Sequence, residues 1–190
     1  MSTSIHTVAL FCGSRFGLHP EFKKTAETLG AALGKAHIKI VYGGGQRGLM
    51  GVVANAAMKE KGEVYGVIPQ FLKDREDINE SATALTITAT MHERKYAMYS
   101  RADAFIILPG GLGTYDEAIE VLTWRQIGLH NKPIIFIDTL GWTKPFCMMI
   151  KQSVEQEFAE RSVFSYFTIV PDSLTALRKL NIKERTPLSL

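Results

Sequence analysis

The chain has 190 residues, of which 46% are hydrophobic and 22% charged, a balance that is ordinary for a globular protein and argues against disorder. Its 22 basic and 19 acidic residues leave a net charge of +3, which is too small to predict binding to nucleic acid or to a membrane surface. No apolar run approaches the ~20 residues of a membrane span, and the N-terminus lacks the pattern of a signal peptide. Two cysteines, Cys12 and Cys147, are too few for a disulfide framework, so we expect reduced, buried thiols and a cytoplasmic protein.

Short apolar runs alternate with longer amphipathic segments along the chain. Strands are expected over residues 6–12, 38–42, 64–68, 85–88, 104–108, 133–137 and 167–170, and helices over 21–36, 48–61, 91–101, 115–129, 143–158 and 173–180. The strands are continuous apolar runs, as in Phe105–Leu108, so both faces of the sheet should be covered by helices. This predicts an α/β fold, a Rossmann-type, doubly wound and mostly parallel sheet flanked by helices.

One domain is expected over residues 1–190, with a core from about residue 5 to 181 and a frayed tail over 182–190. The connection from Pro69 to Ala84 is rich in charge and is expected to form an exposed loop or short helix over the edge of the sheet.

Three glycine-bearing turns follow the first, second and fifth expected strands. The carboxyl ends of parallel strands form one rim where ligands bind, and each turn leads towards a helix N-terminus, whose free N–H groups favour an anion. A phosphorylated small molecule is therefore the expected ligand. The residues concerned are Gly13 and Ser14 in the first turn, Gly43, Gly44 and Gly45 in the second, and Gly110, Gly111, Leu112 and Gly113 in the third.

The second turn also matches the dinucleotide-binding pattern G-x-G-x-x-G through Gly43, Gly45 and Gly48. That pattern belongs after the first strand and needs an acidic residue at the end of the next one, where this chain has Pro69 and Gln70. An NAD-dependent oxidoreductase is therefore disfavoured. A tight turn with close helix packing explains the same glycines and is compatible with a binding role.

Two segments carry charged residues beside these turns. Thr114 and Glu117 have the spacing of a capping box, which would make Glu117 a structural residue at position N3. The three glycines of the turn and its place after a central strand favour a functional role for Glu117 instead. Thr90 and Glu93 form a second possible capping box, followed by Arg94 and Lys95 in the first turns of a helix.

Cations in the first turns of a helix interact unfavourably with the helix dipole. An anionic ligand or a carboxylate nearby would make the interaction favourable. A solvated charged face is an equally good explanation of this segment taken alone. No histidine, including His92, has the spacing of a metal ligand, so we expect no metal.

These segments resemble the LOG ("lonely guy") family of phosphoribohydrolases. The family motif P-G-G-x-G-T-x-x-E matches Pro109–Glu117 fully, and further matches are Met91–Lys95, Tyr42–Gly45 with Gly48–Gly51, Gly66–Pro69 and Leu122–Trp124. Similarity extends from about Val8 to Pro171. Departures from the family pattern are Thr90, Arg125 and the pair Gln46-Arg47, which stands where smaller residues are common.

The resemblance implies hydrolysis of a cytokinin riboside 5′-monophosphate, or of AMP, to a free base and ribose 5-phosphate, by a Rossmann-type homodimer that needs no cofactor. Family members often carry the label lysine decarboxylase, which no lysine in a recognisable pyridoxal-phosphate setting supports here. The implied catalytic residues are Arg94 and Glu117. The implied substrate contacts are Lys95, Met91, Gly111, Leu112, Gly113, Thr114, Tyr115 and Asp116, with further matches at Glu76 and Thr123.

The residues themselves suggest a mechanism. Glu117 near a helix N-terminus should stay ionised at neutral pH and stabilise positive charge on the ribose, or activate water. The N–H groups of residues 111–114 and the Thr114 hydroxyl would hold the 5′-phosphate, and Arg94 and Lys95 would offset its repulsion of Glu117. The expected helix over residues 115–129 carries apolar residues on more than one face, which favours a homodimer. A nucleotide-binding or carrier protein without catalysis is the alternative from another class.

Overall fold

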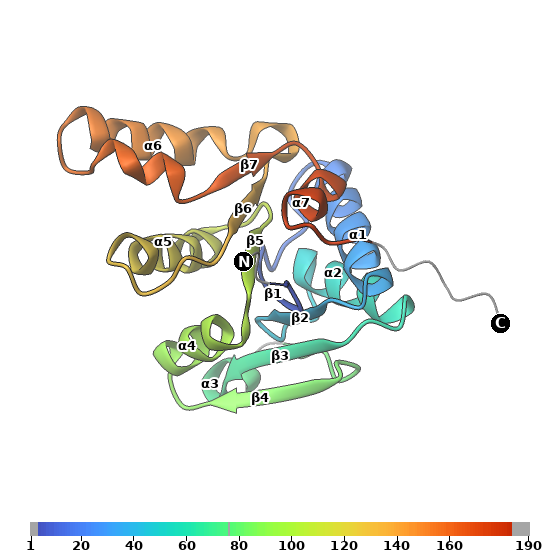
Figure 1. Cartoon of the computed structure of the whole chain (residues 1–190). Helices are drawn as coiled ribbons and strands as arrows, with labels where there is room; N and C mark the ends of the chain where they lie inside the picture. Colours follow the sequence, from blue (N-terminus) through green and yellow to red (C-terminus); the bar gives the residue numbers. More distant parts are fainter. Residues whose placement is uncertain (1–3, 76, 184–190) are drawn as a thin grey trace.

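A single parallel β-sheet forms the centre of the computed structural model, which describes residues 4–75 and 77–183 (Figure 1). Its strands lie in the order β4-β3-β2-β1-β5-β6-β7, and every neighbouring pair is parallel. The chain moves outward from β1 to β4, returns to place β5 against the other side of β1, and moves outward again. The strands are β1 (Thr7–Phe11), β2 (Lys39–Tyr42), β3 (Val64–Pro69), β4 (Ala84–Thr88), β5 (Ala104–Ile107), β6 (Ile134–Ile137) and β7 (Thr168–Val170).

Helices cover both faces of this sheet, as Figure 1 shows. One face packs against α1 (Pro20–Lys35), α2 (Gly48–Lys59) and α7 (Ser173–Lys179), and the other against α4 (Met91–Arg101), α5 (Leu112–Gln126) and α6 (Lys144–Glu155). The short helix α3 (Gln70–Lys73) follows β3, and two 3₁₀ turns span Thr139–Gly141 and Arg161–Ser165. The fold is therefore the predicted doubly wound α/β fold of Rossmann type, and its strand order reverses between β1 and β5.

The burial of the strands explains why the sequence predicted a covered sheet. Every residue of β5 and β6 is buried, as are four of the five residues of β1. The edge strand β4 has no fully buried residue: Ala84 and Ile87 are exposed and the other three are partly buried. Most predicted elements differ from the observed ones only at their ends, and the short helix expected after Pro69 is present as α3.

Two sequence-based predictions of structure are wrong. The helix expected from Tyr115 begins at Leu112, with Gly111 as its N-cap, and Gly110 leaves room for the Thr114 side chain at this start, since a Cβ there would lie 2.0 Å from its Oγ1 atom. Thr114 is therefore not the N-cap and Glu117 is not at N3. Ile182, expected in a frayed tail, is buried beside α7 and donates its N–H to the carbonyl of Leu177 at 2.9 Å. The rest of that tail, residues 184–190, lies outside the described part.

The second capping box is confirmed in part at the start of α4, since the Glu93 carboxylate bonds the N–H of Ala89 and not that of the N-cap. Thr90 is the N-cap, and its hydroxyl accepts a hydrogen bond from the N–H of Glu93 at 3.1 Å. The Glu93 carboxylate in turn accepts the N–H of Ala89 at 2.9 Å. These bonds fix the first turn of α4. No helix in the described ranges is long and apolar enough to cross a membrane.

Candidate active site

A cavity of about 240 Å³ opens where the strand order reverses, at the carboxyl ends of β1, β2 and β5. The three glycine turns meet there, as predicted. The residues expected in the site that line it are Gly13, Ser14, Gly43, Met91, Arg94, Gly111, Leu112, Gly113, Thr114, Asp116 and Glu117. Leu10, Cys12, Met50 and Leu72 also line it and were not proposed from the sequence.

Two of these additional residues could have been found from their neighbours. Cys12 directly precedes the first glycine turn, and Met50 lies in the Gly48–Gly51 segment that follows the second. Leu72 gave no such signal, because the charges around it predicted an exposed connection, whereas α3 brings it to the cavity.

The N-terminus of α5 is the open end of a helix in this cavity. Its N-cap, Gly111, offers no side chain, and the first backbone bond of the helix is donated by Tyr115 to Gly111 at 3.1 Å. The N–H groups of residues 112–114 precede that bond and have no acceptor within the helix. Nothing lies within 4 Å of the position that a Cβ would take at Gly111 or at Gly113. An anion therefore has free access to these donors.

The N-terminus of α2 differs in this respect, contrary to the expectation that each glycine turn leads to free N–H groups. The carbonyl of Gly13 accepts hydrogen bonds from the N–H groups of Leu49 at 3.0 Å and of Met50 at 3.4 Å. The backbone of Ser14 fills the space where Gly48 would carry a Cβ, at 2.2 Å. The G-x-G-x-x-G segment is thus a packing turn, the structural alternative weighed from the sequence.

Arg94 and Glu117 form the charged pair of the cavity. The Arg94 Nη2 atom lies 3.4 Å from the Glu117 Oε1 atom, and both side chains are nearly buried, with exposed fractions of 12% and 11%. Gly43 makes room for this arginine, since a Cβ at that position would lie 2.3 Å from Nη2. The Nε atom of Arg94 is buried and has no hydrogen-bond partner among the described residues. The guanidinium therefore keeps donor capacity for an anionic ligand.

The protonation state of Glu117 departs from the sequence prediction. Burial raises the pKa of its carboxyl group from 4.5 to about 7, against the opposing effect of Arg94. The carboxyl lies in the second turn of α5, beyond the free N–H groups that would stabilise its charge. The expectation of a fully ionised Glu117 at neutral pH is therefore wrong, because desolvation outweighs the attraction of Arg94.

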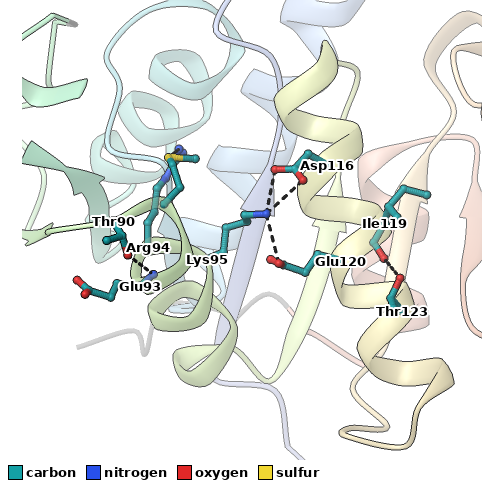
Figure 2. Close-up of polar contacts among 9 residues, drawn as sticks. Thr90, Glu93, Arg94, Lys95, Asp116, Ile119, Glu120 and Thr123 are labelled. Carbon is teal, nitrogen blue, oxygen red and sulfur yellow. Dashed lines mark hydrogen bonds and ion pairs between the residues drawn. The ribbon is translucent and has the colours of Figure 1, made fainter. Parts of the chain in front are cut away.

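Lys95 has a different environment from its neighbour. Its Nζ atom lies 3.0 Å from Asp116 Oδ2 and 3.3 Å from Glu120 Oε1, and Figure 2 shows it reaching from α4 to these two residues of α5. Hydrogen bonds to both carboxylates raise the pKa of Lys95 in spite of its partial burial. Lys95 does not line the cavity. It ties α4 to α5 and so fixes the distance between Arg94 and Glu117.

The other residues expected in the site lie outside this cavity. Tyr115 stacks on Trp142 with ring centroids 5.1 Å apart, and Gly110 packs against Thr114. Gly44 accepts a backbone hydrogen bond from Asn79 at 3.0 Å, and Gly45 lines a neighbouring cavity. Thr123 is exposed and donates to the carbonyl of Ile119 in its own helix at 2.8 Å (Figure 2). Glu76 lies outside the described residues.

Comparison with known proteins places the fold and the motifs in one family. Residues 50–180 match the family model described as "Possible lysine decarboxylase". The cytokinin riboside 5′-monophosphate phosphoribohydrolase LOG1 of Arabidopsis thaliana is 37% identical over 173 residues, which cover 91% of this chain and 81% of the relative. The cytokinin riboside 5′-monophosphate phosphoribohydrolase of Rhodococcoides fascians is 38% identical over 167 residues, with coverage of 87% and 84%.

The chain belongs to the LOG family, and by membership it is an enzyme of the glycosidase class. The relatives named above are phosphoribohydrolases, hydrolases that act on an N-glycosyl bond. A solved structure titled as the molybdenum cofactor binding protein of Rippkaea orientalis has a TM-score of 0.70 at 19% identity and covers 92% of this chain and 94% of its own. At that identity it shows a shared fold only.

The description of the family model as a lysine decarboxylase does not fit the cavity. Decarboxylation of an amino acid on pyridoxal phosphate needs a lysine that can form a Schiff base with the cofactor. Among the described residues no lysine lines this cavity, and Lys95, which follows the lining residue Arg94, is held by Asp116 and Glu120.

Proposed function

We propose that this chain hydrolyses the N-glycosidic bond of a nucleoside 5′-monophosphate, releasing a free base and ribose 5-phosphate. The observation that carries the proposal is the buried Arg94–Glu117 pair beside the free N–H groups of α5. Cytokinin riboside 5′-monophosphates and AMP are the proposed substrates. The cytokinin riboside monophosphates are supported by the names of the relatives. AMP is supported because it has the same nucleotide core as those compounds.

The proposed binding mode follows the distribution of donors. The 5′-phosphate lies against the N–H groups of Leu112, Gly113 and Thr114, where the helix dipole favours an anion. The ribose then lies over Glu117, with C1′ close to the carboxylate. Energy from the phosphate contacts positions the glycosidic bond, although no bond to phosphorus changes.

In the proposed reaction the C1′–N bond breaks and its electron pair goes to the base. Positive charge develops on the ribose ring, and the Glu117 carboxylate stabilises it or takes a proton from the attacking water. Water adds to C1′ and loses a proton, while the leaving base gains one. Arg94 holds Glu117 in place and reduces the repulsion between its charge and that of the phosphate.

A carrier protein without catalysis is the alternative that the shared fold of a molybdenum cofactor binding protein brings to mind. Binding alone gains nothing from a buried carboxylate, since its desolvation and its repulsion of a phosphate both weaken the complex. Glu117 therefore favours the enzyme. Incubation with AMP and with isopentenyladenosine monophosphate tests this directly, because release of adenine or of isopentenyladenine supports hydrolysis. Stoichiometric binding of both without any free base would refute it.

The pH dependence of the reaction should follow Glu117. Because its pKa lies at about 7, the carboxylate fraction rises with pH through neutrality, and kcat/KM for AMP should rise with it and level off one to two pH units higher. The second ionisation of the substrate phosphate, at pH ~6, could also produce a rise of kcat/KM with pH. If Glu117 causes the rise, Glu117→Asp should move the rising part of the pH profile to a different pH. A profile that already levels off at the ordinary carboxyl value of 4.5, or that falls through neutrality, would contradict the carboxylate role.

The same shift affects stability with the opposite sign. Folding favours the neutral form of Glu117, so its contribution to stability is present below the unfolded pKa of 4.5 and is lost as pH rises through about 7. The site thus gives up stability in the pH range in which we expect it to gain activity.

We further propose a homodimer that uses the α4–α5 face. Leu122 of α5 is buried against the sheet, while Ile127 and Leu129 beyond its end and Tyr96 of α4 are large apolar or aromatic side chains left exposed. We expect light scattering to give a molar mass of twice the 21.1 kDa of one chain. Ile127→Asp with Leu129→Asp should produce monomers, whereas Leu174→Asp on α7, on the opposite face, should not. A wild-type monomer with full activity would refute the dimer.

The compartment proposed is the cytoplasm, in keeping with the two unpaired cysteines, Cys12 and Cys147.

A further inference from the structure

A second cavity, which we call the arginine pocket, adjoins the candidate active site. It has a volume of about 280 Å³ and is lined by Ser14, Arg15, Gly45, Arg47, Met50, Arg75 and Asp77. The described residues of this lining include three arginines and one aspartate, which together carry a formal charge of +2. The segments that supply them come from three separate connections, which follow β1, β2 and β3.

Backbone contacts hold these three connections together. The N–H of Gln46 donates to the carbonyl of Asp77 at 2.9 Å, and Gly45 and Ile78 form an isolated antiparallel bridge. On the other side, Gly48 has a φ of 63° and lies so close to the Ser14–Arg15 backbone that a Cβ would come within 2.2 Å of it. The arginines therefore extend from a fixed frame, although their side chains reach solvent.

The positive charge of the pocket is only partly neutralised. Arg47 Nε lies 2.7 Å from Asp77 Oδ2, an exposed ion pair. Within residues 4–75 and 77–183, no ion pair is formed by Arg15 or Arg75. Among the described residues these arginines outnumber the carboxylates that line the cavity, and such a set is suited to a phosphoryl group, which arginines bind through paired N–H donors.

The arginine pocket is continuous with the phosphate end of the candidate active site. Ser14 and Met50 line both cavities, and Ser14 shares the first one with Gly111–Thr114 at the start of α5. A ligand whose first phosphate occupies the α5 amides can extend past Ser14 towards the three arginines.

We propose that the arginine pocket is a second phosphoryl subsite, through which a nucleoside 5′-diphosphate binds more tightly than the monophosphate and competes with it. The proposal rests on the proposed function for the position of the first phosphate. In this complex the α-phosphate lies at the α5 amides, and the β-phosphate lies among Arg15, Arg47 and Arg75. No covalent step is involved, and the diphosphate acts as an inhibitor of base release from AMP.

Calorimetric dissociation constants for ADP and AMP test the subsite when they are measured on chains that carry Glu117→Gln, in which AMP is consumed far more slowly. We expect ADP to bind the chain with all three arginines, called wild type in this comparison, roughly tenfold more tightly than AMP, equivalent to about 1.4 kcal/mol. The double variant Arg47→Ser, Arg75→Gln should bring the two constants close together and leave AMP affinity nearly unchanged. The control Lys73→Gln removes an exposed cation from neighbouring α3 that does not line the pocket, and should keep the preference for ADP. Raising the ionic strength from about 0.05 to about 0.5 M should weaken that preference in the wild type.

Equal affinity for ADP and AMP in the wild type, or a preference for ADP that survives in the double variant, would overturn the subsite. Adenosine 3′,5′-bisphosphate separates the two places where a second phosphate can lie. If this bisphosphate binds as tightly as ADP, and loses as much affinity as ADP in the double variant, the 5′-diphosphate assignment is wrong. Base release from AMP, measured on the chain with Glu117 intact, reports separately on the proposed function. Absence of release refutes that function, whereas the ratio of dissociation constants reports on the pocket.

Discussion

Glu117→Gln is expected to lower kcat for adenine release from AMP by about 10²–10⁴-fold, the range expected when a positioned acid–base group is lost. Glutamine keeps the size of the side chain and its place beside Arg94, and removes the charge that the developing oxocarbenium ion needs. The fold should persist, since α5 takes its N-terminal cap from Gly111 and not from Glu117. Turnover is measured by the appearance of free adenine, and folding by the thermal midpoint.

Glu120→Gln is the matched control for this variant. Glu120 lies one turn further along α5, contacts Lys95 and does not line the cavity, so its loss should change kcat far less. Arg94→Ala should abolish turnover as Glu117→Gln does, because it leaves the buried carboxylate unpaired. Near-normal adenine release by Glu117→Gln would remove this residue from the mechanism. A large loss of thermal stability in that variant, together with normal activity per folded molecule, would make Glu117 a structural residue.

The sheet could be predicted from the sequence because the amino-acid composition of its strands indicates how deeply they are buried. Runs such as Phe105–Ile107 are apolar at every position, and only a strand covered on both faces allows this. The glycine turns could be placed at one rim because parallel strands end on the same edge. These arguments depend on chain order alone, which is why they predicted most of the cavity lining, including Ser14, Gly43 and Gly111.

The protonation and pairing of the charged residues could not be predicted in the same way. They depend on where α5 begins, and a change of three residues moved Glu117 from a capping position into a buried second turn. Lys95 was expected beside the phosphate together with Arg94, but adjacent residues on a helix point in different directions. As a result Arg94 lies in the cavity, while Lys95 binds Asp116 and Glu120 of α5.

Adenosine should be a far poorer substrate than AMP, with kcat/KM lower by roughly 10³-fold or more, because the phosphate is the group that the site holds most firmly. When the phosphate is missing, the N–H groups of residues 112–114 have no acceptor within the helix and the Arg94 Nε atom has no hydrogen-bond partner among the described residues. Without these contacts the nucleoside is not held with C1′ over Glu117. Much of the loss should therefore appear in kcat as well as in KM.

Paired measurements of adenine release from AMP and from adenosine, with no added nicotinamide cofactor or divalent metal, test this selectivity. Thr114→Val offers a variant for the same comparison, since it removes a hydroxyl at the start of α5 and keeps the buried shape of the side chain. If that hydroxyl contacts the phosphate, Thr114→Val should weaken AMP turnover and leave the residual adenosine turnover unchanged. If the wild type had comparable kcat/KM for AMP and for adenosine, the α5 amides would not bind the phosphate. In that case Glu117 would act on a ribose that is positioned by its base alone.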